Sequence, residues 1–434
     1  MNGTDLSPSR TLVTSFNPKT TTASQLQANQ LGSDYFEEGD WVLCVTSSSH
    51  SSCNPPWIGC ALSNGEVQTY DQTKLHTLQT YHQDSLVTDL VYDVSNPYSL
   101  IASSADGTVT IYDIRQAHNP ASQVRLPRQG EEALSVSIGF QGTVAAVGSN
   151  KAKIHFFDLR GTGGVLGTYN QSHTNEITRV RFQTIPSSPG NLMTTNTTPI
   201  LVSAAEDGLA CVYDTSQVTE EAAIQNVLAV QSPVREIGFF GPQSEGIYCL
   251  TGSESLQLYH KDDSVCRHDF GPNMRQYLAQ ILTEKFVPNN GSSPQSMTTI
   301  DYLVDCHWDQ DRQALQLLVG NGQGDSALFQ VGEHGVSFMN RLRGGHRGVI
   351  RAWNFLSSNV FVTVGEDARM CEWNRASNLF GAGSAAIPTA SLLPQKGPEI
   401  LVANGGSKRG NVVLAKPGGG KMRRPRSRMS ASPY

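Results

Sequence analysis

The chain has 434 residues, which suffices for one large all-β domain or for two or three average domains. Hydrophobic residues make up 38%, charged residues only 16%, and glycine occurs 40 times, a composition that disfavours a helical bundle, a coiled coil and wholesale disorder. The net charge is -6, but every charged residue after Glu399 is basic, so residues 1–399 carry −14 and form an acidic body with a basic C-terminal end.

Residues 1–33 are rich in Ser and Thr, and we predict that they are disordered apart from one closing strand. The first residues lack the basic and apolar regions of a secretory signal, and no run of 18 apolar residues predicts a transmembrane helix. The eight cysteines are scattered without a Cys-x-x-Cys pair, so we expect neither a zinc site nor a redox motif. This cysteine usage favours a reducing intracellular compartment.

An internal repeat dominates the sequence between residues 34 and 376. Three segments align without gaps: LIASSADGTVTIYD at 100–113, LVSAAEDGLACVYD at 201–214 and FVTVGEDARMCEWN at 361–374. Each predicts an apolar strand, a tight turn that contains Asp, and an alternating strand that ends in an aromatic residue followed by Asp or Asn. Upstream of each stands a histidine, followed by another apolar strand: His82, His173 and His346.

Weaker copies fill the gaps between these segments. The aromatic residue that ends each copy falls at position 70, 112, 157, 213, 259, 329 or 373. Four of the six spacings are close to the period of about 40–45 residues that is typical of propeller blades. Residues 234–239 with 247–259 predict a fifth copy, and residues 302–308 with 315–329 predict a sixth.

These features resemble the WD40 repeat, including the Gly345-His346 opening and the final Trp373. The resemblance implies an all-β fold, a seven-bladed WD40 β-propeller with disordered N- and C-terminal tails. Blade seven then needs an outer strand from elsewhere, and residues 11–16, 399–403 and 411–415 are candidates. We favour the N-terminal segment, because that closure is usual in the family.

Two insertions interrupt the repeats. Residues 184–199 within blade four predict a loop, and residues 272–299 between blades five and six predict a helix followed by a linker. The helix is indicated by apolar residues at helical spacing from Met274 to Phe286, and it could pack on the propeller or on a partner. Residues 377–434 predict a flexible basic tail, with five basic residues near its end: Lys421, Arg423, Arg424, Arg426 and Arg428.

A polar set recurs within three of the predicted blades. Blade two offers His82, Asp106 and Tyr112; blade four offers His173, Ser203, Asp207 and Tyr213; blade seven offers His346, Thr363, Asp367 and Trp373. A hydrolase could use Ser, His and Asp, but one active site does not recur at repeat spacing. The resemblance implies a structural hydrogen-bond chain in each blade instead.

The resemblance also implies a partner-binding top face, at which the first strand of each blade begins. Counting back from the aromatic residue of each first strand, and taking the residue before each turn Asp, predicts the following contacts: Leu86, Thr88, Glu176, Thr178, Glu206, Arg235, Tyr302, Arg351 and Glu366. Tyr302 is the predicted aromatic anchor of this face.

Several phrases narrow the resemblance, among them SHTNEITRVRF at 172–182 and GGHRGVIR at 344–351. They are similar to the subfamily of WD repeat-containing protein 89 over roughly residues 40–376. We therefore predict a non-catalytic scaffold without cofactor or metal, a monomeric propeller that binds other proteins through its top face within a larger complex. The basic tail favours an intracellular, preferably nuclear, location and offers a contact for RNA or an import receptor. An RNA-linked factor in ribosome assembly and a propeller hydrolase are the alternatives.

Overall fold

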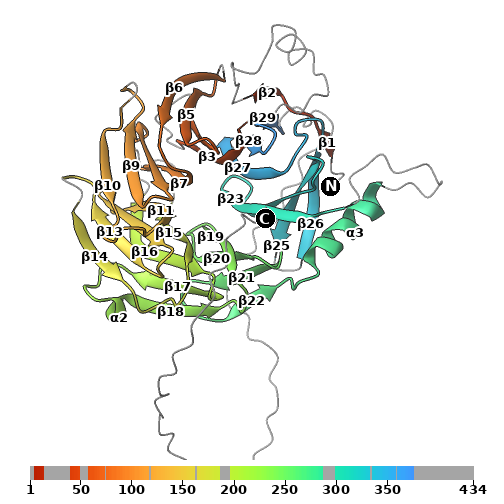
Figure 1. Cartoon of the computed structure of the whole chain (residues 1–434). Helices are drawn as coiled ribbons and strands as arrows, with labels where there is room; N and C mark the ends of the chain where they lie inside the picture. The colour runs from red at the N-terminus through yellow and green to blue at the C-terminus, as the bar shows by residue number, and fades with distance from the viewer. Residues whose placement is uncertain are drawn as a thin grey trace, which may run out of the picture. The chain divides into compact units, whose positions relative to one another are not determined.

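The computed structural model shows a propeller of seven β-sheets arranged around a central channel (Figure 1). The structure describes residues 4–13, 40–48, 57–73, 75–116, 119–161, 164–185, 196–286, 299–332, 335–357 and 359–375. The predicted N-terminal segment 14–33, the inner part of the 184–199 insertion, the linker after residue 286 and the basic tail from residue 376 onward therefore lie outside the described residues.

Each blade is an antiparallel sheet in which strands that follow one another in the chain are paired. Blade one comprises β3 (Val42–Ser47), β4 (Trp57–Leu62), β5 (Glu66–Asp71) and β6 (His76–His82). Blade two comprises β7 (Val87–Tyr92), β8 (Ser99–Ser104), β9 (Thr108–Asp113) and β10 (Ser122–Arg125). Blade three comprises β11 (Ala133–Gly139), β12 (Val144–Ser149), β13 (Ile154–Asp158) and β14 (Val165–Tyr169). Blade four comprises β15 (Ile177–Ile185), β16 (Asn196–Ala205), β17 (Leu209–Asp214) and β18 (Ile224–Ala229).

The last three blades follow the same order, and two strands from the N-terminus are added to blades six and seven. Blade five comprises β19 (Val234–Phe240), β20 (Gly246–Thr251), β21 (Leu256–His260) and β22 (Cys266–Asp269). Blade six comprises β23 (Tyr302–Asp309), β24 (Ala314–Gly320), β25 (Ser326–Gly332) and β26 (Gly335–Leu342), and blade seven has β27 (Ile350–Ser357), β28 (Val360–Gly365) and β29 (Arg369–Asn374). The first strand of every blade contacts the first strand of the next, so these seven strands surround the channel.

The N-terminal segment closes the ring, which confirms the favoured closure. Strand β2 (Arg10–Val13) pairs antiparallel with β29 as the fourth strand of blade seven. The side chain of Arg10 forms an ion pair with Glu372 and donates to the carbonyls of Gln72 and Thr73 in blade one, so the closing strand joins the first and last blades. An unpredicted strand, β1 (Thr4–Leu6), pairs parallel with β26 and gives blade six a fifth strand.

The turn between the second and third strands follows the repeat pattern closely. In blade two, Asp106 accepts a hydrogen bond from the backbone N–H of Thr108, and Gly107 has a φ of +81°. A Cβ atom at Gly107 would lie 2.3 Å from the carbonyl oxygen of Glu131. Glycine is thus required here both for its backbone conformation and for the close approach of the next blade.

Every first strand contains a β-bulge near its start, a feature that the sequence does not reveal. In all seven blades the register with the second strand shifts by one residue, which leaves one extra residue: Leu43, Thr88, Leu134, Thr178, Arg235, Val304 and Arg351. A bulge reverses the alternation of the strand, so the residue after it points toward the opposite face. The next residues along the strands are Cys44, Asp89, Ser135, Arg179, Glu236, Asp305 and Ala352.

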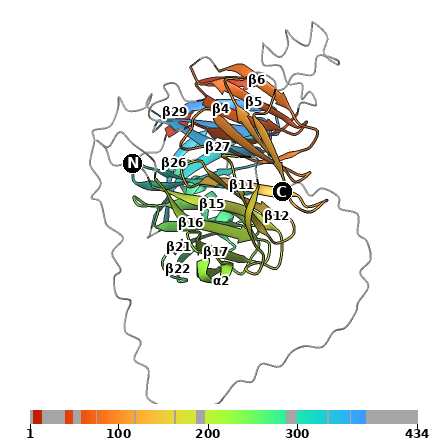
Figure 2. The same ribbon diagram turned by 90° about the vertical axis from the view of Figure 1, so that its left-hand side faces the viewer.

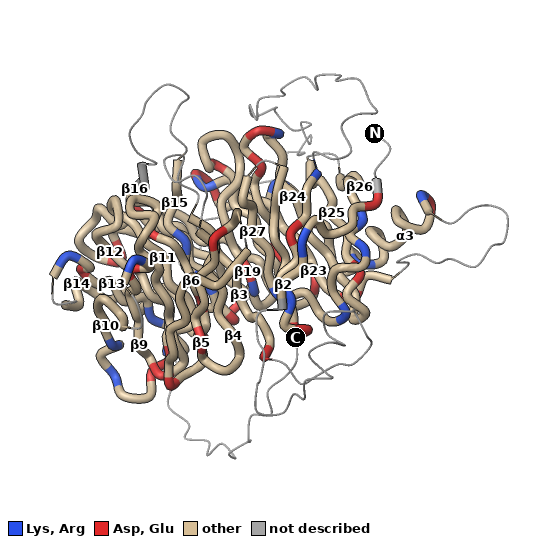
Figure 3. The backbone as a smooth tube through the Cα atoms, turned by 90° about the horizontal axis from the view of Figure 1, so that it is seen from above, with Lys and Arg blue, Asp and Glu red and all other residues tan. Residues whose placement is uncertain are grey.

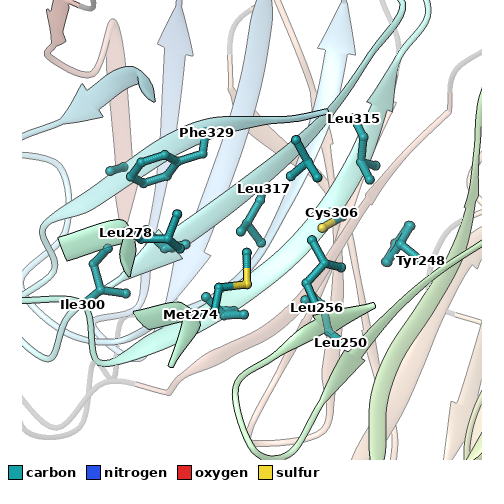
Figure 4. Close-up of a cluster of buried hydrophobic side chains, with 14 of the residues drawn as sticks. Tyr248, Leu250, Leu256, Met274, Leu278, Ile300, Cys306, Leu315, Leu317 and Phe329 are labelled. Atoms are coloured by element: carbon teal, nitrogen blue, oxygen red, sulfur yellow. The ribbon is translucent and has the colours of Figure 1, made fainter. Parts of the chain in front are cut away.

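The predicted helix forms α3 (Met274–Phe286) and packs on the propeller itself. Its buried residues Met274, Leu278 and Leu282 join a hydrophobic cluster with side chains of blades five and six, such as Leu256 and Phe329 (Figure 4). A short helix, α2 (Glu220–Ala223), lies beside β17 and β18 (Figure 2). Among the described helices, none is long and apolar enough to cross a membrane.

Candidate protein-interaction surface

Blades four and seven contain the predicted polar chains. In blade seven, Trp373 Nε1 donates to Thr363 Oγ1 at 2.8 Å, Thr363 Oγ1 lies 2.7 Å from His346 Nε2, and His346 Nδ1 lies 3.0 Å from Asp367. In blade four, the hydroxyl of Tyr213 lies 3.2 Å from Ser203 Oγ, which lies 2.6 Å from Nε2 of His173. Each chain connects the second and third strands of its blade to the loop before that blade.

The carboxylates hold both histidines in the protonated form. Burial alone would lower the pKa of His173 and of His346, but the hydrogen bonds to Asp207 and Asp367 are among the interactions that outweigh it and raise each pKa to about 9. Ser203 and Thr363 have no exposed surface. A protonated histidine cannot act as a base toward the hydroxyl beside it, and substrate cannot reach these hydroxyls, so the geometry favours a structural role.

Blade two departs from the prediction at His82. The side chain of His82 is 75% exposed and lies 3.4 Å from Glu66, and it takes no part in a buried chain. The neighbouring Gln83 takes its place and bonds both Tyr112 and Ser104. One extra residue before the first strand shifts the register of this loop, so the glutamine points inward and the histidine outward.

Blade three contains a buried chain that the sequence analysis missed. Glu131, from the loop before the blade, lies 2.9 Å from His155 Nε2 on β13 and accepts a hydrogen bond from Ser149 at 2.6 Å. All three side chains are buried. In this blade the loop before the first strand supplies the acid and the third strand supplies the histidine, so a search for His before the first strand passes over the pair.

Three of the predicted top-face residues link neighbouring blades. They lie on the bulges, and each donates to a carbonyl at the start of the next blade: Thr88 to Ala133, Thr178 to Val234 and Arg235 to Leu303. A side chain that is bonded in this way is less available to a partner. The prediction that counted back from the aromatic residue of each first strand thus identified side chains that bond between blades.

Tyr302 likewise bonds within the propeller. Its hydroxyl accepts a hydrogen bond from the backbone N–H of Ile350 at 2.7 Å, and its ring packs against the core between blades six and seven. An aromatic residue that is exposed is Trp41, which directly precedes β3 of blade one and has 41% of its surface accessible. The sequence analysis missed Trp41, because no histidine precedes the first strand of blade one. The signal that could have identified Trp41 is its position directly before that strand.

Arg351 and Glu366 form an ion pair on blade seven, and the guanidinium of Arg351 lies 5.7 Å from the ring centre of Trp41. Leu86, before the first strand of blade two, is also exposed. Tryptophan and arginine are the residue types that contribute most at protein interfaces. At the same end of their first strands, blade seven thus presents a charged group, blade one an aromatic group and blade two an aliphatic group.

Blades three and four present carboxylates at that end. Burial raises the pKa of Glu176, and the charges of Glu206 and Glu132 raise it further. Glu206 is exposed. Along the described backbone of the propeller, lysine and arginine are interspersed with aspartate and glutamate (Figure 3).

The channel walls carry a second set of charges below the bulges. Arg181 forms an ion pair with Asp89 at 2.8 Å, and Arg179 forms one with Glu236 at 2.6 Å. Burial and the charge of Glu236 raise the pKa of Asp305, which accepts a hydrogen bond from Tyr248. The two ion pairs connect the first strands of blades two, four and five, and the hydrogen bond from Tyr248 connects the second strand of blade five to the first strand of blade six. No group of three or more His, Cys, Asp or Glu side chains that could hold a metal ion occurs among the described residues.

Comparison with known proteins supports the repeat assignment. A family model described as "WD domain, G-beta repeat" matches residues 72–113, which span β6 and the first three strands of blade two. The repeat unit is therefore offset from the blade by one strand, and this offset is the reason that blade seven takes its last strand from the N-terminus.

Two curated relatives match most of the chain. The "WD repeat-containing protein 89 homolog" of Dictyostelium discoideum is 27% identical over 326 residues, which cover 74% of this chain and 81% of the relative. The "WD repeat-containing protein GTS1" of Arabidopsis thaliana is 25% identical over 368 residues, 81% of this chain and 83% of the relative.

A solved structure shares the fold. A chain in the crystal structure of a mitotic checkpoint complex superposes with a TM-score of 0.58 at 13% identity, covering 85% of this chain and 92% of that one. The chain is thus a seven-bladed β-propeller whose repeats resemble the WD40 repeat and whose sequence is similar to WD repeat-containing protein 89.

Proposed function

We propose that this protein is a non-catalytic scaffold that assembles a nuclear protein complex through the top face of its propeller. The exposed Trp41 beside the Arg351–Glu366 pair is the observation that carries the proposal. An exposed tryptophan on a rigid surface loses little conformational entropy when a partner covers it, and it offers a large apolar area.

The rest of the top face supports this role by its mixed character. Leu86 continues the apolar part of the surface, and Glu176 and Glu206 supply carboxylates on blade four. Apolar anchors with a charged surround are typical of protein interfaces, where charge sets orientation and specificity. The buried Ser, His and carboxylate sets stabilise the blades in this proposal and catalyse no reaction.

Quantitative affinity capture from cells tests the top face. Trp41→Ala and Glu206→Lys should each reduce the recovery of the same partners by at least about tenfold, since interface hot spots contribute about 2 kcal/mol or more. Leu166→Ala, on the exposed outer strand of blade three, and Asp262→Lys, in a loop at the opposite face, are the matched controls. Unchanged recovery with both top-face variants would overturn the assignment.

The nuclear location is tested separately through the basic tail. We expect a fluorescent fusion of the full chain to accumulate in the nucleus and a fusion that lacks residues 404–434 to lose that accumulation. A cytoplasmic full-length fusion would contradict the nuclear part of the proposal, while the scaffold role would still be decided by the capture experiment.

A further inference from the structure

A cavity of about 250 Å³ lies at the end of the channel opposite the top face. It is formed where the first strands of blades one to four end, and its walls come from three kinds of residue. The hydroxyl residues are Thr46, Ser47, Ser48, Ser137 and Thr184; the apolar and aromatic residues are Val91, Tyr92, Val94, Pro97, Ile138 and Phe182; the charged residues are Asp93 and Arg181. This volume is slightly below that of pockets for drug-sized ligands, which begin at about 300 Å³, so the cavity suits a group the size of one amino acid residue.

Arg181 presents one half of its guanidinium to this cavity. Its Nη1 donates to Asp89 at 2.8 Å, to Ser135 at 3.0 Å and to the carbonyl of Val180 at 2.9 Å. Its Nη2 and Nε have no hydrogen-bond partner among the described residues, and the side chain is 27% exposed. One edge of the guanidinium is thus fixed by the channel wall, while the other remains able to bind an acceptor.

Hydroxyl groups line the same cavity as Arg181. Ser137 Oγ accepts a hydrogen bond from the backbone N–H of Phe182 at 2.9 Å, which leaves its proton free to donate. The hydroxyl of Thr46 has no hydrogen-bond partner among the described residues. A guanidinium edge beside donating hydroxyls favours a carboxylate, which accepts hydrogen bonds at both oxygens.

Asp93 restricts the ligand further. Its Oδ1 accepts hydrogen bonds from the backbone N–H and the hydroxyl of Ser95, at 2.8 and 2.7 Å, while its Oδ2 has no hydrogen bond among the described residues. A second negative charge on the ligand would be repelled by Asp93 and by Asp89, which disfavours a phosphate dianion. The free oxygen instead favours an N–H group close to the ligand carboxylate.

We propose that this cavity binds an α-amino or α-amido carboxylate, the group found at the C-terminus of a peptide and in a free amino acid. The carboxylate binds the open edge of Arg181 together with the hydroxyls, the adjacent N–H donates to Asp93, and an aliphatic side chain packs on Val91 and Ile138. The site is separate from the top face and does not depend on the proposed scaffold function.

Ligand-observed NMR with the full chain tests this site with four probes: N-acetyl-leucine, its amide, free leucine and inorganic phosphate. We expect N-acetyl-leucine to bind at least tenfold more tightly than its amide, because the amide lacks the charge that Arg181 recognises. Tighter binding of N-acetyl-leucine than of leucine indicates a peptide C-terminus as the natural ligand, and the reverse order indicates a free amino acid. Equal binding of acid and amide, phosphate binding as tight as that of the acid, or no binding of either acid overturns the proposal.

Two variants locate the binding. Val94→Trp at the rim fills the cavity without touching the ion pair of Arg181, and it should abolish binding of the acid. Val165→Trp, on the exposed outer strand of blade three, is the control and should bind as the natural chain does. Arg181→Lys keeps the positive charge near Asp89 but loses the second donor edge, so binding should weaken about tenfold while the melting temperature shows that the propeller is folded. Unchanged binding in Val94→Trp would show that the ligand sits elsewhere.

Discussion

Blades seven and three both contain a buried chain of a carboxylate, a histidine and a hydroxyl, but different elements supply these groups. In blade seven the loop before the blade supplies His346 and the turn supplies its carboxylate, Asp367. In blade three the loop supplies the carboxylate of Glu131, and the third strand supplies His155. The difference teaches that folding requires each buried donor to meet an acceptor, whereas the position of either group within the blade can vary.

The largest expected effect comes from removing the central hydroxyl of blade seven. Thr363→Val leaves His346 Nε2 and Trp373 Nε1 buried without a partner, and we expect the free energy of unfolding to fall by about 3 kcal/mol. Chemical denaturation measures this loss. Thr69→Val in blade one is the matched control: Thr69 is equally buried, but its hydroxyl has no hydrogen-bond partner in the described structure, so this change should be neutral or slightly stabilising. Equal losses in the two variants would contradict the role of Thr363.

A double-mutant cycle examines the Glu131–His155 pair in blade three. Glu131→Gln and His155→Gln should each destabilise the chain by about 1–3 kcal/mol, because each leaves a buried partner poorly satisfied. The double variant should cost less than the two single losses together, with a coupling energy of at least about 1 kcal/mol. Additive losses would show that the two side chains do not stabilise each other.

The histidine chains of blades four and seven should make the stability of the protein fall as the pH rises. Because the pKa of His173 and of His346 is raised from 6.5 to about 9 on folding, their contribution is complete below pH 6.5 and is lost as the pH rises through 9. The melting temperature should therefore fall by a few degrees between roughly pH 6 and pH 9.5. His346→Gln should show a smaller fall than the natural chain. A flat profile in the natural chain would exclude the raised pKa values.

The smallest effect is expected at His82, which lies outside the buried chains. His82→Ala should change the free energy of unfolding by no more than about 0.5 kcal/mol, as is usual for exposed residues. Gln83→Ala should cost about 1–2 kcal/mol, since it removes the bonds to Tyr112 and Ser104. A larger loss at His82 than at Gln83 would reverse the assignment of blade two.

The repeat itself could be predicted because its signals are local. Strand alternation, the turn Asp and the terminal aromatic residue all lie within about 14 consecutive residues, as in LVSAAEDGLACVYD, and short-range backbone preferences determine them. The helix at Met274–Phe286 was predicted for the same reason, since apolar spacing indicates it, whereas the N-terminal closing strand was favoured because that closure is usual in the family that the repeats resemble.

The candidate site was predicted less well, because its residues depend on register. One bulge in each first strand reverses the direction of the following side chains, so Thr88, Thr178 and Arg235 donate to the next blade, while Asp89 and Arg179 form ion pairs with other first strands. A one-residue shift likewise exchanges His82 for Gln83. Side-chain direction alternates along a strand, and such shifts leave no trace in composition or periodicity.

The sequence by itself determined that this protein is a ring of seven blades with an acidic body and a basic end, because each blade repeats a local pattern. Only the tertiary structure decided which side chains bond between blades, which form the exposed surface around Trp41, and which surround the cavity at Arg181. Those outcomes depend on contacts between residues that lie far apart in the chain, such as Asp89 with Arg181 and Trp41 with Arg351, and such contacts exist only once the ring has closed.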